Sequence, residues 1–131
     1  MKITLRRGLP YITVTLTFHD ERVQLENILL DTGSAGSVFA TDKLAPVGLK
    51  YEPSDPLYTI RGVGGAEFVF VKRIDRLMID RLSVQDFEIE VGALDYGFEI
   101  DGILGMDFLT AVGAVIDLNR MEIRAAIRDD Q

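Results

Sequence analysis

The amino-acid sequence predicts an all-β protein, either a sandwich or a barrel, in a single domain that spans residues 1–131. Three observations lead to this fold class. Apolar residues recur mainly with a period of two, turn signals separate short segments along the whole chain, and only one short segment favours a helix. The length of 131 residues is enough for a hydrophobic core without disulfide bonds or a structural metal.

The expected elements follow directly from this pattern. Residues 11–18 alternate most clearly, with Ile, Val, Leu and Phe on one face. Segments rich in Gly, Pro, Asp and Asn mark the hairpin connections, residues 41–56 and 92–99 form longer irregular connections, and 106–111 is the helix. The expected strands are 2–7, 11–18, 22–30, 57–61, 66–74, 76–80, 82–91, 100–104, 114–118 and 121–127.

Composition excludes several classes of function. There is no cysteine, which excludes disulfide scaffolds and thiol chemistry, and the single histidine, His19, disfavours a histidine-rich metal site. The net charge of −7 disfavours nucleic acids and anionic membranes as partners. We find no signal peptide and no apolar run long enough to span a membrane, so we expect a cytoplasmic protein.

Asp31 stands at the end of the apolar run Ile28-Leu29-Leu30 and is followed by Thr32, Gly33 and Ser34. A carboxylate at the end of a buried strand is costly unless it is hydrogen-bonded or used in function. The hydroxyls and amides that follow it are suitable donors. Asp-Thr-Gly is also ordinary turn chemistry, so this segment alone leaves a structural and a catalytic interpretation open.

The glycine-rich segment Gly62-Val63-Gly64-Gly65 leaves similar alternatives open. An ordinary hairpin turn needs no further function. Phosphate binding is disfavoured because a strand, not a helix, follows the glycines. A third interpretation is a mobile hairpin that closes over a ligand.

Three motifs in order resemble the retroviral-type (retropepsin-like) aspartic proteases. Residues 29–34 are similar to the active-site loop of that family, in which two apolar residues precede Asp-Thr-Gly. Residues 60–65 resemble the flap hairpin that covers the substrate. Residues 101–109 resemble the apolar-apolar-Gly segment and short helix that support the active-site loop from behind. The resemblance spans about residues 10–127.

The resemblance implies a closed barrel and an aspartic endopeptidase, that is, a hydrolase that needs no metal or other cofactor. Because Asp-Thr-Gly occurs once, it also implies a homodimer in which two Asp31 carboxylates form the catalytic dyad. Thr32 would hydrogen-bond across the two-fold axis, and the Gly33 amide and Ser34 hydroxyl would donate to the carboxylates. The substrate would be an extended peptide in a mostly apolar cleft, with neither nucleic acid nor membrane as a partner.

Substrate binding is expected from both sides of the cleft. The backbones of Ala35 and Gly36 would contact the peptide, although retroviral enzymes often carry acidic side chains at these places. Residues 62–65 would close over it, with Val63 at the tip.

The other acidic residues receive structural interpretations. Asp101 precedes a glycine but lacks the hydroxyl pattern, so it is expected to anchor a loop. Asp107 at the start of the expected helix suits the positive end of the helix dipole. Glu88, Glu90 and Glu99 are expected on a solvated face.

Two alternatives to the enzyme remain. One is a non-catalytic peptide-binding or dimerisation module with the same fold, which would explain the missing acidic residues at 35 and 36. The other is an unrelated β-sandwich in which Asp31 is a turn residue.

Overall fold

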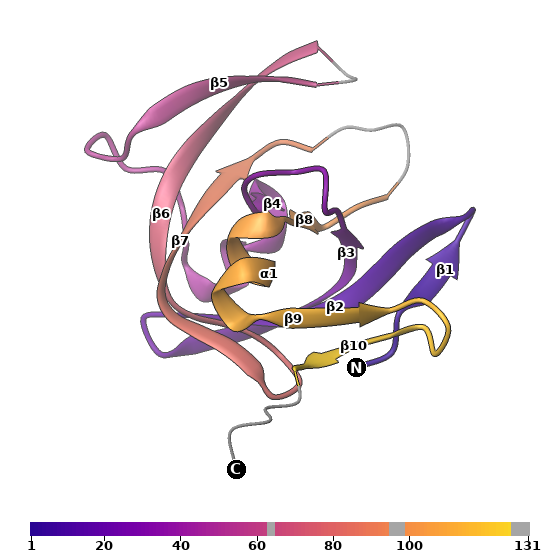
Figure 1. Cartoon of the computed structure of the whole chain (residues 1–131). Helices are drawn as coiled ribbons and strands as arrows, with labels where there is room; N and C mark the ends of the chain where they lie inside the picture. The colour runs from indigo at the N-terminus through magenta and orange to yellow at the C-terminus, as the bar shows by residue number, and fades with distance from the viewer. Residues whose placement is uncertain (63–64, 95–98, 127–131) are drawn as a thin grey trace.

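The structure is a computed structural model that describes residues 1–62, 65–94 and 99–126. It confirms the all-β prediction (Figure 1). The strands are β1 (Thr4–Arg6), β2 (Leu9–Phe18), β3 (Glu21–Leu30), β4 (Val38–Ala40), β5 (Leu57–Gly62), β6 (Gly65–Ile79), β7 (Leu82–Gly92), β8 (Gly102–Leu104), β9 (Ala114–Asp117) and β10 (Glu122–Ala125). The helix α1 (Met106–Val112) lies close to its predicted position, and two 3-10 turns, η1 (Thr41–Lys43) and η2 (Ala45–Val47), lie in the segment predicted to be irregular.

The main sheet closes on itself to form a barrel. Its strand order is β1-β2-β3-β8-β4-β7-β6-β5, and β2 also pairs with β6. That second pairing joins Leu16 to Leu77 in antiparallel register and completes a ring of six strands. Closure pairs the backbone groups that would otherwise form open edges, which leaves β1 and β5 as the outer strands of this sheet.

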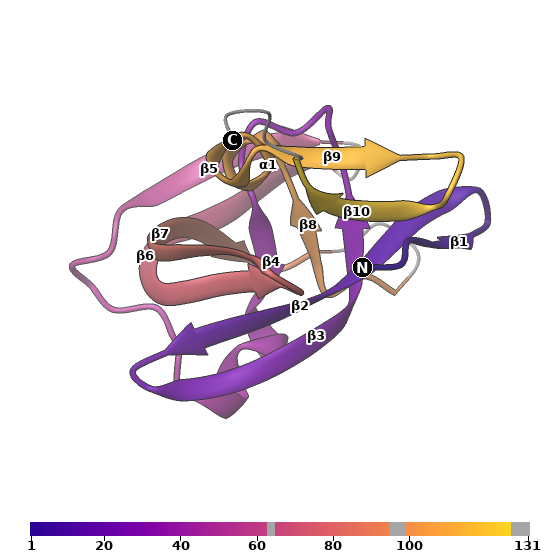
Figure 2. The same ribbon diagram turned by 60° about the horizontal axis from the view of Figure 1, so that its bottom comes forward.

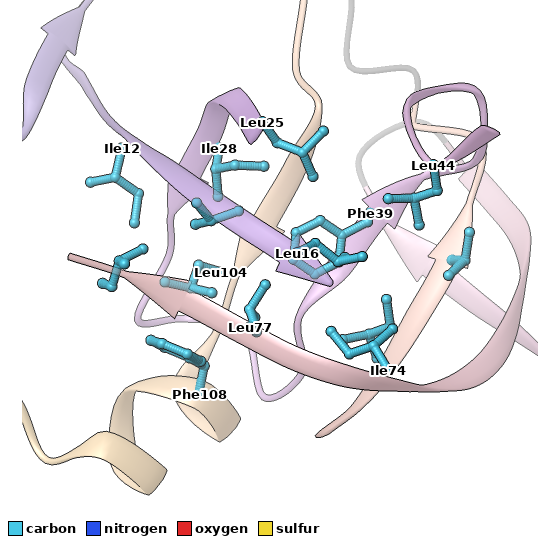
Figure 3. Close-up of a cluster of buried hydrophobic side chains, with 14 of the residues drawn as sticks. Ile12, Leu16, Leu25, Ile28, Phe39, Leu44, Ile74, Leu77, Leu104 and Phe108 are labelled. Carbon is cyan, nitrogen blue, oxygen red and sulfur yellow. The ribbon is translucent and has the colours of Figure 1, made fainter. Parts of the chain in front are cut away.

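The alternating pattern of β2 determines which of its side chains enter the barrel. Ile12, Val14, Leu16 and Phe18 are all buried, as the period of two predicts. Figure 3 shows side chains from β2, β3, β4, β6, β8 and α1 converging in the core. Phe39 of β4 and Phe108 of α1 are its largest fully buried members, so the helix closes one side of the same core.

Two details of the strands differ from the sequence prediction. Residues 66–74 and 76–80 were expected as separate strands but belong to the single strand β6, which keeps one register with β7 on either side of Asp75. The strand β4 was not predicted, because three residues are too few to show a period.

The C-terminal hairpin β9–β10 lies at the base of the barrel together with the N-terminus (Figures 1 and 2). The Ile3 amide donates to the Met121 carbonyl, and the Ile123 amide donates to the Met1 carbonyl, so the first residues extend this small sheet. Within the described ranges, α1 is the only α-helix, and it is far too short to cross a membrane.

Candidate active site

Asp31 directly follows the buried end of β3 and is half-buried. Its amide donates to the Leu104 carbonyl over 3.0 Å, which continues the β3–β8 ladder by one residue. The Gly33 amide donates to the Asp31 carboxylate over 2.9 Å, and the Ser34 amide donates to the Asp31 carbonyl over 3.2 Å. The turn therefore presents the carboxylate in a defined position, as the sequence predicted for the Gly33 amide.

The Ser34 hydroxyl makes a different contact from the one expected. It donates to the Gly36 carbonyl over 2.7 Å, so its proton is engaged within the loop and not at Asp31. The backbone turn brings the Gly36 carbonyl two residues away within reach, and a hydroxyl has only one proton to donate. In the single chain, Ser34 thus holds the loop shape and does not contact the carboxylate as a donor.

A latch of side-chain hydrogen bonds joins the active-site loop to the start of α1. The Ser37 hydroxyl donates to Asp107 Oδ1 over 2.7 Å and accepts the Gly105 amide over 3.0 Å. The Ser37 amide donates to Asp107 Oδ2 over 3.0 Å. Ser37 is almost fully buried, so these bonds satisfy groups that water cannot reach.

Backbone contacts reinforce this latch. The Met106 amide donates to the Ser34 carbonyl over 2.8 Å, and the Asp107 amide donates to the Ala35 carbonyl over 3.2 Å. The first free amides of the helix are therefore satisfied by the loop. A Cβ on Gly105 would lie 2.7 Å from the Ser34 carbonyl oxygen and even closer to that of Gly36, so only glycine permits this approach. Asp107 is thus more than a helix-dipole residue, because it fixes the loop that carries Asp31.

Of the glycine-rich segment, Gly62 is the last residue of β5 and Gly65 is the first residue of β6. These two strands form a hairpin in antiparallel register from Leu57↔Phe70 to Gly62↔Gly65. Val63 and Gly64, the expected tip, lie outside the described residues. Figure 1 shows the hairpin extending above the loop that follows β3. The loop residues Thr32, Gly33 and Ala35 are exposed, whereas Ser34 and Gly36 are partly covered.

Asp101 occupies the opposite end of β8 from Asp31 and serves as a loop anchor, as expected. Its amide donates to the Asn27 carbonyl over 2.8 Å, and its Oδ2 accepts the Asn27 amide over 3.2 Å. Lys43 lies 3.7 Å from its other oxygen. Two residues of extended strand, Gly102 and Ile103, lie between Asp101 and the Leu104–Asp31 contact, so Asp101 is not a second acid for the same site.

Glu90 lies closer to the loop that carries Asp31 than the sequence predicted. It was expected on a solvated face, but it is half-buried and its Oε1 lies 2.9 Å from the place that a Cβ on Gly36 would occupy. Burial raises the pKa of the Glu90 carboxyl, and the negative charges of Asp107 and Glu88 raise it further. Glu90 stands in no local motif, and only the pairing of β7 with β4 brings it to the loop. Ser37 follows Gly36 directly, but its partner Asp107 is 70 positions away in the sequence.

Comparison with protein families identifies the family to which the chain belongs. A family model described as aspartyl protease matches residues 14–108, which include β3, the active-site loop, the β5–β6 hairpin and the start of α1. No individual curated protein gives a significant match. Since the match covers most of the chain, the protein belongs to an aspartyl protease family of the retropepsin-like clan.

Proposed function

We propose that the protein is an aspartic endopeptidase that acts as a homodimer, with one Asp31 from each chain in the catalytic dyad. The observation that carries this proposal is the latched loop, which holds a single, partly exposed carboxylate at the end of β3. A pair of carboxylates is needed for aspartic protease chemistry. Asp-Thr-Gly occurs once in the sequence, so the second carboxylate comes from a second copy.

The chemistry follows from two carboxyl groups roughly 3 Å apart, which share one proton, as is established for aspartic protease dyads. The ionised carboxylate takes a proton from a water molecule while the water oxygen bonds to the peptide carbonyl carbon. The protonated carboxyl gives its proton to the carbonyl oxygen. The resulting tetrahedral intermediate collapses as the C–N bond breaks, and the leaving nitrogen takes the proton that the first carboxylate received from water. One hydroxyl of the intermediate returns its proton to the other carboxylate as the new carbonyl group forms, which restores the dyad with one proton.

The remaining site residues have supporting roles in this proposal. Thr32 is exposed at the tip of the loop, where its hydroxyl can reach the partner copy across the axis. The Gly33 amide orients the Asp31 carboxylate. The backbones of Ala35 and Gly36 bind an extended peptide from below, and Gly62 to Gly65, with Val63 at the tip, close over it as a flap.

Mixing subunits tests the shared dyad directly. Asp31→Asn removes the ionisable group with little change of shape, so this homodimer should not cleave peptides that wild type cleaves. After subunit exchange, an equal amount of Asp31→Asn should lower wild-type activity to about half, since only about a quarter of the dimers keep both carboxylates. Cleavage of a peptide library, at roughly pH 3 to 8, provides the measurement, with a statine-type transition-state analogue as inhibitor.

Asp20→Asn is the matched control. Asp20 is exposed, and its positive φ of 66° suits asparagine, so this subunit should fold and add activity on mixing. Activity that is unchanged by excess Asp31→Asn would contradict a dyad formed from two chains. A folded dimer that binds peptides but cleaves none at any pH would instead establish the non-catalytic module.

A further inference from the structure

A row of five side chains crosses the barrel wall next to Asp31. The strand register pairs Leu29 with Ile103, Ile103 with Val38, Val38 with Glu90, and Glu90 with Val71. Residues paired in register on neighbouring strands point to the same face of a sheet. The row therefore runs from β3 through β8, β4 and β7 to β6 on one face.

This face is the one opposite the barrel core. The next residues along the strands, Leu30, Leu104, Phe39 and Val91, belong to the core cluster, and Figure 3 shows Leu104 and Phe39 among the core side chains. Alternation along a strand places the row on the other face. Leu29 precedes Asp31 by two residues, so the row begins on the side of the sheet to which the Asp31 carboxylate belongs.

Four of the five side chains in this row are apolar, and Glu90 is the exception. Ile103 and Val38 are nearly buried, at 7% and 6% exposure, while Leu29, Glu90 and Val71 are partly exposed. Of the apolar members, Leu29 and Val71 remain accessible, and apolar side chains suit hydrophobic substrate residues next to the scissile bond.

The Glu90 carboxylate leans toward the active-site loop. It fills the space above Gly36 that a side chain at position 36 would otherwise take. The Glu90 amide donates to the Ser37 carbonyl over 3.0 Å, which fixes the strand against the loop. Among the residues whose side chains the structure describes, 1–59, 68–94 and 99–126, no hydrogen bond or ion pair engages the carboxylate.

The charges around Glu90 favour a cation. The carboxylates of Asp107 and Glu88 add negative charge near it. The two cations that follow Val71 on β6 have other partners, because Lys72 contacts Glu52 and Asp55, and Arg73 lies 3.7 Å from Glu88. A partly buried carboxylate is stabilised by a hydrogen-bond donor, most strongly by a charged one.

We propose that Glu90 determines substrate specificity by binding a Lys or Arg side chain of the peptide. This inference rests on the proposed function of the Asp31 site. Three strand spacings separate β3 from β7, roughly 14 Å, and an extended peptide covers that distance in about four residues. Since the glutamate side chain leans back toward the loop, the basic residue lies about two to four positions from the scissile bond.

Peptide sets that differ at one position test this proposal. Each set carries Lys, norleucine or Glu at one position within four residues of the scissile bond, because norleucine matches the lysine stem without its charge. Wild type should prefer Lys over norleucine at one or more of these positions by roughly tenfold or more in kcat/KM. Glu90→Gln should reduce that preference to about twofold or less, and Glu90→Lys should reverse it in favour of Glu.

Glu88→Gln is the matched control, because Glu88 is exposed, carries the same charge and lies two residues away on the same face of β7. It should lower the preference for Lys by much less than Glu90→Gln does, because the exposed Glu88 contributes only a neighbouring, screened charge. A wild-type enzyme without any preference for Lys, or a preference that survives Glu90→Gln, would overturn the role of Glu90.

Binding measurements separate this inference from the proposed catalysis. The same peptides are titrated into the Asp31→Asn protein with and without Glu90→Gln, using fluorescence anisotropy. Loss of the preference for Lys on Glu90→Gln supports the inference even if wild type cleaves nothing, in which case only the endopeptidase proposal fails. Equal binding of Lys and norleucine peptides, or no binding of either, counts against Glu90 as a specificity residue.

Discussion

Ser37 and Asp107 are separated by 70 positions in the chain, yet they form two hydrogen bonds with each other. Asp107 Oδ1 also accepts the Phe108 amide over 2.7 Å, so one carboxylate serves both the loop and the first turn of α1. Charge-assisted bonds of this kind are shorter and stronger than those between neutral groups. The position of Asp31 therefore depends on two residues that never touch it.

Replacement of Ser37 tests this dependence. Ser37→Ala leaves the Gly105 amide without its acceptor and removes one donor from Asp107. We expect a loss of about 1–3 kcal/mol in the free energy of unfolding, because buried polar groups lose their partners. We also expect a lower kcat at unchanged protein concentration, since the loop is less well fixed. Urea unfolding and steady-state kinetics provide the two measurements.

Ser83→Ala serves as the control for this variant. Ser83 is exposed on β7, and its replacement should change the free energy of unfolding by less than about 0.5 kcal/mol. A Ser37→Ala protein with wild-type stability and kcat would show that the latch is dispensable.

For single residues, the sequence correctly predicted a contact only where both partners lie in one turn. Asp31 and Gly33 form the expected contact because two residues separate them. The Ser34 hydroxyl was assigned to the carboxylate but donates to the Gly36 carbonyl, since backbone dihedrals determine which nearby acceptor it reaches. Ser37 was missed because its partner is remote in the chain.

The base of the β5–β6 hairpin is held by one lysine. Lys72 is 8% exposed and lies 2.7 Å from both Glu52 and Asp55, which belong to the irregular segment before β5. The Val71 amide also donates to the Pro56 carbonyl over 3.0 Å. These contacts fix the segment before β5 to β6 at the base of the hairpin.

The ion pairs of Lys72 with Glu52 and Asp55 make the free energy of unfolding depend on pH. The hydrogen bond from Lys72 lowers the pKa of Asp55 below its usual 3.8. Burial lowers the pKa of Lys72, but hydrogen bonds with Asp55 and Glu52 outweigh it and raise the pKa above 10.5. The stabilisation from the Lys72–Asp55 pair is therefore fully present between about pH 5 and pH 10. It is lost as the pH falls through the folded-state pKa of Asp55, and it is lost again as the pH rises above the usual pKa of Lys72.

The measurement is a double-mutant cycle of Lys72→Met and Asp55→Asn, followed by urea unfolding from pH 2 to 8 in roughly unit steps. The coupling free energy should be constant from about pH 5 to 8 and decline below about pH 4. Lys50→Met, at an exposed lysine of the same segment, should show no coupling with Asp55. A coupling that is equally large at the lowest pH would refute the ionic origin.

Most elements were predictable because each carries its own pattern. The long alternation of β2 and the hairpin signals around β3 needed no tertiary information. β4 was missed because it has only three residues. β6 was divided in two because Asp75 interrupts its apolar pattern, yet the register with β7 continues on both sides of that residue.

At the scale of the whole molecule, the single Asp31 per chain predicts that activity depends on protein concentration. Dilution should lower the activity per mole of chain, because in the proposed mechanism a monomer supplies only one of the two carboxylates. Sedimentation at the same concentrations should show the dimer fraction and the specific activity declining together. A statine-type analogue that contacts both chains of the dimer should stabilise the dimer by mass action. The decline of the dimer fraction should then occur at lower protein concentration.

Specific activity that stays constant down to concentrations at which sedimentation shows only monomer would place the whole active site in one chain. Asp101 is not a candidate partner for Asp31 in that case, because its contacts with Asn27 and Lys43 hold it at the far end of β8.

The sequence by itself determined the fold class, most of the strands and the identity of the loop that carries Asp31. These features depend on local patterns, such as alternation with a period of two or the small residues of a tight turn. Local patterns also indicated that one face of β2 is buried, since its side chains alternate so regularly.

Only the tertiary structure decided which distant segments meet. Closure of the ring by Leu16 and Leu77, the latch between Ser37 and Asp107, and the position of Glu90 over Gly36 all depend on strand register. A strand carries information about which face is apolar but little about which remote strand it will join. The sequence therefore contained Glu90, but only the folded chain shows that it lies next to the loop that carries Asp31.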